Sequence, residues 1–118
     1  MSPECFANPK SGYYQNCDTW SLGTILFELV TGVHPLVDDI TTLGLALYRI
    51  YDGVASVQLD RIELFKSAPV GLRNLIEKML IIDKELRPTV NELLLKNEWL
   101  REQVQKHILN KKQYAAIY

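Results

Sequence analysis

Cysteines are scarce in this sequence, and long apolar runs are missing from it. Only Cys5 and Cys17 occur among 118 residues, which is too few for the disulfide framework of a small secreted domain. No stretch reaches the roughly 18–20 consecutive apolar residues of a membrane span. Residues 1–10 also lack the cationic and apolar regions of a secretory signal. We therefore expect two free thiols, no membrane partner, and an intracellular, cytoplasmic location, with the nucleus also open.

An excess of positive charge is lacking as well. The chain carries 13 Lys and Arg residues against 14 Asp and Glu residues, a net charge of −1, whereas nucleic-acid binding normally needs clustered basic charge. A helix-turn-helix fits residues 70–100 by pattern, but no basic helix accompanies it, so we expect no nucleic-acid partner. The basic residues from Lys106 to Lys112 fit either a contact with an acidic partner or a solvated helix end, where cations are favourable.

The spacing of the apolar residues predicts an all-α chain with about five helices and no sheet. Apolar residues make up 47% and charged residues 23% of the chain, as in ordinary globular domains. Residues 1–17 are expected as a loop, 54–66 as irregular, and 110–118 as a frayed end. The expected helices are Thr19–Thr31, a segment near Thr41–Tyr51, a segment opened by Ser67 and Pro69, a short segment from Thr89 to about Lys96, and a last segment beginning near Trp99.

Several helix ends carry recognisable signals. Asp18 fits an N-cap, because its carboxylate can accept N–H groups of the first turn. Gly32 fits the position just after the same helix, and Thr89 with Glu92 is typical of a capping box. The helix Thr19–Thr31 is apolar on nearly all of its faces, which places it in a protein centre.

Spacing alone predicts no catalytic, cofactor-binding or metal-binding residue. His34 and His107 are isolated, and the two cysteines lack the second Cys or His pair of a zinc site. Asp38 and Asp39 are neighbours in a polar turn, not a general acid and base. The glycine-rich phosphate motifs and the GxSxG nucleophile motif do not occur. We therefore expect no cofactor in this chain.

Three short strings are more specific. Ser2-Pro3-Glu4 is followed by Asp18-Thr19-Trp20-Ser21-Leu22-Gly23 and, much later, by Leu86-Arg87-Pro88-Thr89. A chance match to the middle string has odds on the order of one in ten thousand. In order and spacing, the strings resemble the second half of the large lobe of a eukaryotic protein kinase catalytic domain. The first is similar to the Ala-Pro-Glu motif that ends the activation segment, and the second to the start of the central F helix.

The resemblance implies a fold and a domain organisation. Residues 1–100 would be a partial kinase domain, the helical C-terminal subregion of the large lobe, and residues 101–118 a C-terminal helical tail. Ser2 and Pro3 would mark the end of the activation segment. Glu4 would pair with Arg87 through two parallel hydrogen bonds, because a planar guanidinium matches a carboxylate.

The same resemblance assigns roles to three residues at the start of the central helix. Asp18 would accept backbone N–H groups of the catalytic loop in addition to capping its helix. Trp20 would pack in the core under the substrate-binding region, and Gly23 would let neighbouring backbone approach closely. The departures from the kinase family pattern are mild. Ser2 stands in place of the commoner alanine, Thr19 in place of the usual Val or Ile, and Leu36 in place of a common Phe.

The working parts of phosphoryl transfer are missing from these residues. The glycine-rich loop, the Val-Ala-Ile-Lys lysine, the H-R-D loop and the D-F-G magnesium site do not occur in the sequence, and in family order they would lie before Met1. The string Met-Ser-Pro-Glu occurs in several serine/threonine kinase groups, including the NimA-related and mitogen-activated kinase kinase groups, and we favour the first. Met1 fits either an initiator or an internal methionine.

Two hypotheses follow. In the first, the chain is an inactive fragment of a serine/threonine kinase. The parent would use ATP and Mg²⁺ and act on protein substrates. The partners of the fragment would be the remainder of the kinase domain and a substrate or regulatory protein. In the second, it is a non-catalytic, kinase-derived helical module that binds protein partners. The substrate, the pathway, the oligomeric state and the activity of the parent stay open at this point.

Overall fold

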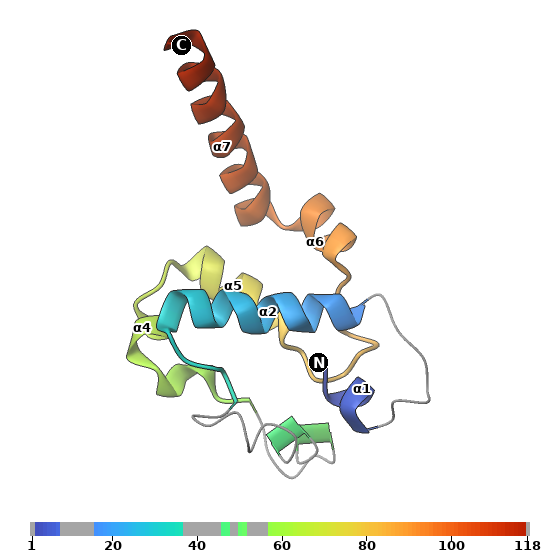
Figure 1. Cartoon of the computed structure of the whole chain (residues 1–118). Helices are drawn as coiled ribbons and strands as arrows, with labels where there is room; N and C mark the ends of the chain where they lie inside the picture. The colour runs from blue at the N-terminus through green and yellow to red at the C-terminus, as the bar shows by residue number, and fades with distance from the viewer. Residues whose placement is uncertain (1, 8–15, 37–45, 48–49, 52–56, 118) are drawn as a thin grey trace.

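The structure is a computed structural model that describes residues 2–7, 16–36, 46–47, 50–51 and 57–117 (Figure 1). Every regular element among these residues is helical, which confirms the predicted all-α class. The predicted helix near Thr41–Tyr51 is described at residues 46–47 and 50–51, which are helical, and otherwise lies outside the described residues. The elements are α1 (Pro3–Ala7), α2 (Asn16–Thr31), the 3-10 turn η3 (Leu59–Arg61), α4 (Glu63–Lys66), α5 (Val70–Met79), α6 (Val90–Lys96) and α7 (Glu98–Ile117).

Helix α2 crosses the centre of the molecule, with α5 packed along it (Figure 1). Its buried face includes Trp20 and Phe27, and the ring of Phe27 lies 5.3 Å from that of Phe65 in α4. Such a tilted aromatic pair contributes about 0.5–1.5 kcal/mol beyond its buried area. Gly32 ends the helix with a φ of 79°, which confirms the predicted glycine position, since other residues rarely adopt this conformation.

Two groups of buried side chains form the core. The first surrounds α2 and consists of Trp20, Phe27, Leu47, Leu59, Phe65, Ile76 and Leu80. The second joins α5 to α6 and to the start of α7, and consists of Leu75, Met79 and Leu93 with Leu26, Trp99 and Leu100 packed against them. Because both groups include side chains of α2 and α5, these two helices connect the whole core.

The prediction of a loop over residues 1–17 is wrong at residues 3–7 and 16–17, whereas residues 1 and 8–15 lie outside the described residues. Residues Pro3–Ala7 form α1, where proline is tolerated because its missing N–H falls in the first turn. Helix α2 begins at Asn16, so Asp18 is a first-turn residue and not the N-cap. The side-chain amide of Asn16 donates to the carbonyls of Lys84 and Arg87, and these contacts hold the chain in place before the expected cap.

Two further expectations are corrected. The segment 54–66, expected as irregular, contains η3 and α4, whose Leu59 and Phe65 are buried in the core. Residues 57–58 have no regular structure, as expected, and residues 54–56 lie outside the described residues. Residues 110–117 are not frayed, because α7 continues to Ile117. Burial of Leu59 and Phe65 stabilises η3 and α4, whereas the end of α7 simply continues the turns that precede it.

The capping box at α6 has the predicted N-cap but different reciprocal bonding. The Thr89 hydroxyl oxygen accepts a hydrogen bond from the backbone N–H of Glu92 at 3.2 Å. The Glu92 carboxylate accepts from that hydroxyl at 3.3 Å, where the full capping box would have it bound to the backbone N–H of Thr89.

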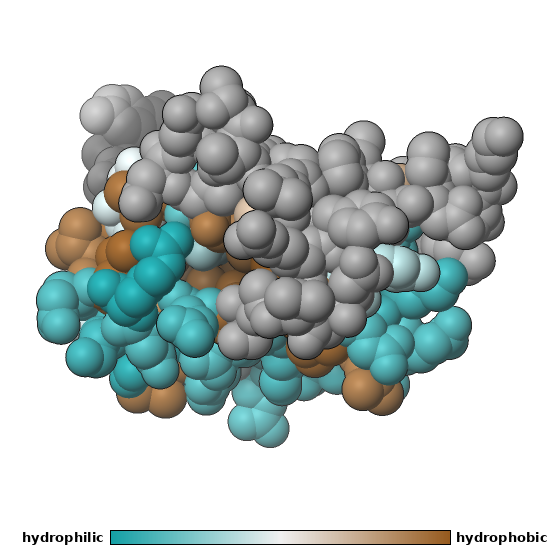
Figure 2. Space-filling model, turned by 90° about the horizontal axis from the view of Figure 1, so that it is seen from below, coloured by the Kyte–Doolittle hydropathy of each residue, from teal (hydrophilic) through white to brown (hydrophobic). Residues whose placement is uncertain are grey.

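Helix α7 gives the molecule an elongated shape, with extents of 53 × 32 × 23 Å. Its first turns contact α5 and α6, and the rest projects away from the other helices (Figure 1). No helix in the described part of the chain is long and apolar enough to cross a membrane. Figure 2 shows hydrophobic side chains interspersed with hydrophilic ones on the face seen from below.

Candidate functional site

The candidate site is an ion pair between two residues 83 positions apart in the sequence. Glu4 lies in α1, and Arg87 lies in the segment that connects α5 to α6. The Nη1 atom of Arg87 donates to Glu4 Oε1 at 2.7 Å, and Nη2 donates to Oε2 at 3.1 Å. Both residues are buried, with 5% of Glu4 and 3% of Arg87 exposed. The structure thus brings together the two residues that the resemblance pairs.

Arg87 also binds three backbone carbonyls. Its Nε donates to Ile81 O at 2.7 Å, Nη2 to Ile82 O at 3.0 Å, and Nη1 to Asn16 O at 3.1 Å. All five N–H groups of the guanidinium are therefore used. Its Cζ atom lies 5.1 Å from the ring centroid of Trp20, a distance typical of a cation–π contact. One side chain consequently connects α1, the start of α2 and the segment after α5.

The charge of Glu4 is maintained by these contacts. Burial alone would raise the pKa of the Glu4 carboxyl group. The hydrogen bonds from Arg87 oppose this effect, and the Glu4 backbone, the Arg87 charge and Ser2 make smaller contributions in the same direction. Together they outweigh burial and lower the pKa below its ordinary value of 4.5. The carboxylate is therefore ionised at neutral pH. A buried pair of this kind avoids the cost of an unpaired charge only while both partners are present.

Two thiols lie beside the ion pair. The Sγ atoms of Cys5 and Cys17 are 2.7 Å apart, and both cysteines are free. The Ser2 hydroxyl donates to Cys17 Sγ at 3.3 Å, and the Cys17 thiol donates to Glu4 Oε1 at 3.6 Å. Sequence reasoning missed this cluster. The available signal was that each cysteine directly adjoins a motif residue, namely Glu4 or Asp18.

The remaining predicted residues are distributed over three places. Ser2 and Pro3 are fully buried next to the ion pair. Trp20 lies under the guanidinium of Arg87. Asp18 is exposed, and Gly23 faces α5, where a Cβ atom would lie 2.8 Å from the Cβ of Met79. The three nearest atoms to that position are side-chain atoms of Met79 and Leu80, and the expected close approach of backbone to Gly23 stays a prediction.

The cluster of Glu4, Cys5 and Cys17 also has a geometry in which a metal ion can be considered. One ligand atom from each residue lies within 4.8 Å of the others. However, both carboxylate oxygens of Glu4 already accept hydrogen bonds from Arg87. The adjacent guanidinium would also repel a cation, so the three residues do not fit a structural metal site, which normally has four ligands.

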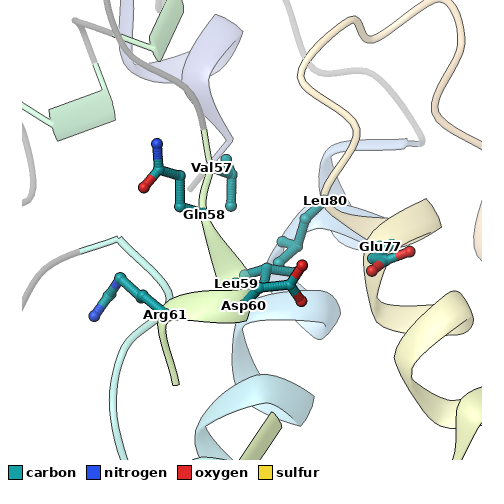
Figure 3. A pocket seen from close by; sticks show the side chains of 7 residues that line it. All are labelled: Val57, Gln58, Leu59, Asp60, Arg61, Glu77 and Leu80. Carbon is teal, nitrogen blue, oxygen red and sulfur yellow. The ribbon is translucent and has the colours of Figure 1, made fainter. Parts of the chain in front are cut away.

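A separate cavity of about 460 Å³ lies between η3 and α5 (Figure 3). Asp60 extends toward α5, which carries Glu77, whereas Arg61 extends in the opposite direction. The Arg61 guanidinium donates to the carbonyls of Pro35 at 2.9 Å and His34 at 3.3 Å. None of the residues predicted from the sequence motifs is among the described residues that line this cavity.

Comparisons with known proteins agree with the motif order. The family model described as "Protein kinase domain" matches residues 1–100. The chain is 36% identical over 96 residues to the probable serine/threonine-protein kinase nek3 of Dictyostelium discoideum, covering 80% of this chain and 8% of the relative. It is 32% identical over 93 residues to the ovarian-specific serine/threonine-protein kinase Lok of Drosophila melanogaster, covering 79% and 18%. The chain thus spans less than a fifth of each relative.

Proposed function

The chain belongs to the protein kinase domain family, as a segment derived from a serine/threonine kinase, and we propose that it supports the active site of a larger kinase. The parent protein would transfer the γ-phosphoryl group of ATP to Ser or Thr hydroxyls of protein substrates. The segment would hold the end of the activation segment and contact substrate or regulatory proteins. Nucleic acids and membranes are not among the proposed partners, and the proposed location is the cytoplasm, with the nucleus also open.

The observation that carries this proposal is the ion pair between Glu4 and Arg87. In the proposed role, Ser2, Pro3 and Glu4 end the activation segment, and the pair ties this end to the helical core. A substrate-positioning surface must be held within a fraction of an ångström to be effective. Five hydrogen bonds from one buried arginine supply such a rigid connection.

In the proposed parent, ATP and Mg²⁺ would be bound outside this chain. None of the ATP-binding or magnesium-binding motifs of the family lies within these 118 residues. ATP and Mg²⁺ would be held by the remainder of the kinase domain, so the isolated chain should have no phosphoryl-transfer activity.

The test uses the 118-residue chain and a longer product of the same gene. Millimolar ATP with Mg²⁺ should leave the melting temperature of the short chain unchanged, and radiolabelled ATP should give no phosphate transfer to a generic protein substrate. A longer product with in-frame H-R-D and D-F-G motifs should instead melt at a higher temperature with ATP and Mg²⁺ and should transfer phosphate to the substrate. Binding or transfer by the short chain would contradict its inactivity, and an inactive longer product would contradict the kinase role of the parent.

A second candidate function is a non-catalytic helical module that binds proteins. Three exposed apolar side chains on one face of α2 favour this function. Leu22 is 40% exposed, Ile25 is 51% exposed and Leu29 is 76% exposed. The transcript upstream of Met1 discriminates between the candidates. An in-frame H-R-D and D-F-G sequence would support the kinase, whereas a genuine start codon without them would support the binding module.

A further inference from the structure

Cys5 and Cys17 meet at a place where the proposed kinase role uses neither of them. Cys5 directly follows Glu4 in α1, and Cys17 directly follows Asn16 in the first turn of α2. Arg87 binds both the Glu4 carboxylate and the Asn16 carbonyl. The arginine that builds the ion pair therefore also holds the two thiols against each other, although they are twelve positions apart in the sequence.

The two thiols differ in access to solvent. Cys17 is 5% exposed, whereas Cys5 is half-buried and can meet a small reagent. Burial and the hydrogen bond with the Cys17 thiol raise the pKa of Cys5, and the hydrogen bond with Ser2 opposes them to a smaller extent. The charges of Cys17 and Glu4 raise the pKa a little further. Because the thiolate is the reactive form, Cys5 should react slowly at neutral pH and faster as the pH rises.

We propose that Cys5 and Cys17 are a redox modification site, at which a peroxide converts the two thiols into an intramolecular disulfide that glutathione reverses. The two cysteines are in contact, one of them is accessible, and no other cysteine in the sequence competes for either. The inference is independent of the proposed kinase role, since it depends only on the contact between α1 and α2.

The reaction balances with hydrogen peroxide as the oxidant. The Cys5 thiolate attacks one peroxide oxygen, the O–O bond breaks, and the leaving hydroxide takes up a proton to give water and a Cys5 sulfenic acid. The Cys17 thiol loses its proton, its sulfur attacks the Cys5 sulfur, and the S–O bond breaks with release of a second water. Two thiols are oxidised by two electrons, and one peroxide is reduced to two waters. Two glutathione thiols restore both cysteines and leave oxidised glutathione.

The disulfide would act as a second connection beside the ion pair. It would join α1 covalently to the first turn of α2, where the other connections are the ion pair and hydrogen bonds. A crosslink restricts the unfolded chain and so favours the folded state. The oxidised chain should therefore keep α1 in place even when the ion pair is weakened.

The experiment treats the folded, reduced chain with hydrogen peroxide and follows it by intact mass and thiol titration. The monomer should lose about 2 Da, both thiols should disappear together, and a peptide map should show Cys5 linked to Cys17. In a glutathione redox buffer, the ratio of disulfide to dithiol should be at least about tenfold higher for the folded chain than for the chain in guanidinium, because folding and the crosslink favour each other.

The variants Cys5→Ser and Cys17→Ser are the matched controls. Each should lose the 2 Da product and instead gain an oxygen or one glutathione on the remaining thiol. Equal ratios for the folded and unfolded chain would overturn the proposal, as would disulfide-linked dimers as the main product. Titration with Zn²⁺ tests the alternative: if the wild-type chain binds Zn²⁺ and this protects both thiols from peroxide, the cluster is a metal site and the proposal is wrong.

Discussion

Arg87 is the residue on which three separate segments depend. Its guanidinium binds the Glu4 carboxylate with two N–H groups and the carbonyls of Ile81, Ile82 and Asn16 with the others. Only a planar group with five donors can satisfy this set, because a lysine ammonium carries three donors on a single atom. The site therefore requires arginine in particular, beyond its positive charge.

Replacement of Arg87 should be strongly destabilising. We expect Arg87→Ala to lower the free energy of unfolding by about 3–5 kcal/mol, because the Glu4 charge is left buried without a partner. Arg87→Lys should recover only part of this loss, since it cannot form two parallel hydrogen bonds to one carboxylate. Urea denaturation followed by circular dichroism measures both changes.

The exposed ion pair of α4 provides a matched control. Glu63 and Lys66 are 3.5 Å apart, and their side chains are 86% and 51% exposed. Lys66→Ala should change the free energy of unfolding by no more than about 1 kcal/mol. An Arg87→Lys variant as stable as the wild-type chain would show that the paired geometry contributes nothing.

The ionisation of Glu4 should appear in the pH dependence of stability. Its pKa is lowered in the folded chain, so below the ordinary value the unfolded chain binds a proton that the folded chain does not. The stabilisation is fully present above pH 4.5 and is lost as the pH falls through the folded pKa. Glu4→Gln should remove this contribution to the acid sensitivity. Identical acid profiles for variant and wild-type chain in urea titrations at several pH values would contradict the prediction.

At the scale of elements, the sequence was sufficient where signals were local. The periodic residues of α5, the Thr89 cap of α6 and Gly32 after α2 were all predicted, because propensity and capping act within a few residues. The short elements α1, η3 and α4 were missed, since buried anchors such as Glu4, Leu59 and Phe65 stabilise them from distant parts of the chain.

The candidate site shows the same limit. The pairing of Glu4 with Arg87 was expected only from the family resemblance, because no local pattern connects residues 83 positions apart. The contact between Cys5 and Cys17 was not expected at all. It joins a residue of α1 to one of α2, directly beside Glu4 and Asn16, both of which Arg87 binds.

The packing of α2 against α5 should be sensitive to a single methyl group at Gly23. Alanine normally stabilises a helix by about 1 kcal/mol relative to glycine. Here its Cβ would lie 2.8 Å from Met79 Cβ and 3.0 Å from Leu80 Cδ2, and such overpacking costs about 1–3 kcal/mol. We expect Gly23→Ala to lower the melting temperature, as measured by circular dichroism.

A substitution on the exposed side of the same helix is the control for Gly23→Ala. Leu29 is 76% exposed, so Leu29→Ala should change stability by less than about 0.5 kcal/mol. A Gly23→Ala chain that is more stable than the wild type would show that the two helices separate easily and that their contact is not tightly packed.

At the scale of the whole molecule, α2 is a central helix with one side uncovered. Its inner face packs against α4 and α5, while Leu22, Ile25 and Leu29 form an exposed stripe at helical spacing. A helix that is apolar on nearly all faces belongs in a protein interior. In both proposed functions, we expect this stripe to be covered, by the remainder of a kinase domain in the first and by another protein in the second.

The isolated chain should consequently bind a hydrophobic dye or self-associate through this stripe, because contiguous exposed apolar surface is unusual on a monomer. The triple variant Leu22→Glu, Ile25→Glu, Leu29→Glu should reduce dye fluorescence and restore a monomer in light scattering, with its helical circular dichroism retained. Leu64→Glu on α4, where the side chain is 59% exposed, is the matched control and should leave dye binding unchanged. A monodisperse wild-type chain that binds no dye would contradict the prediction, because the stripe would then need no cover.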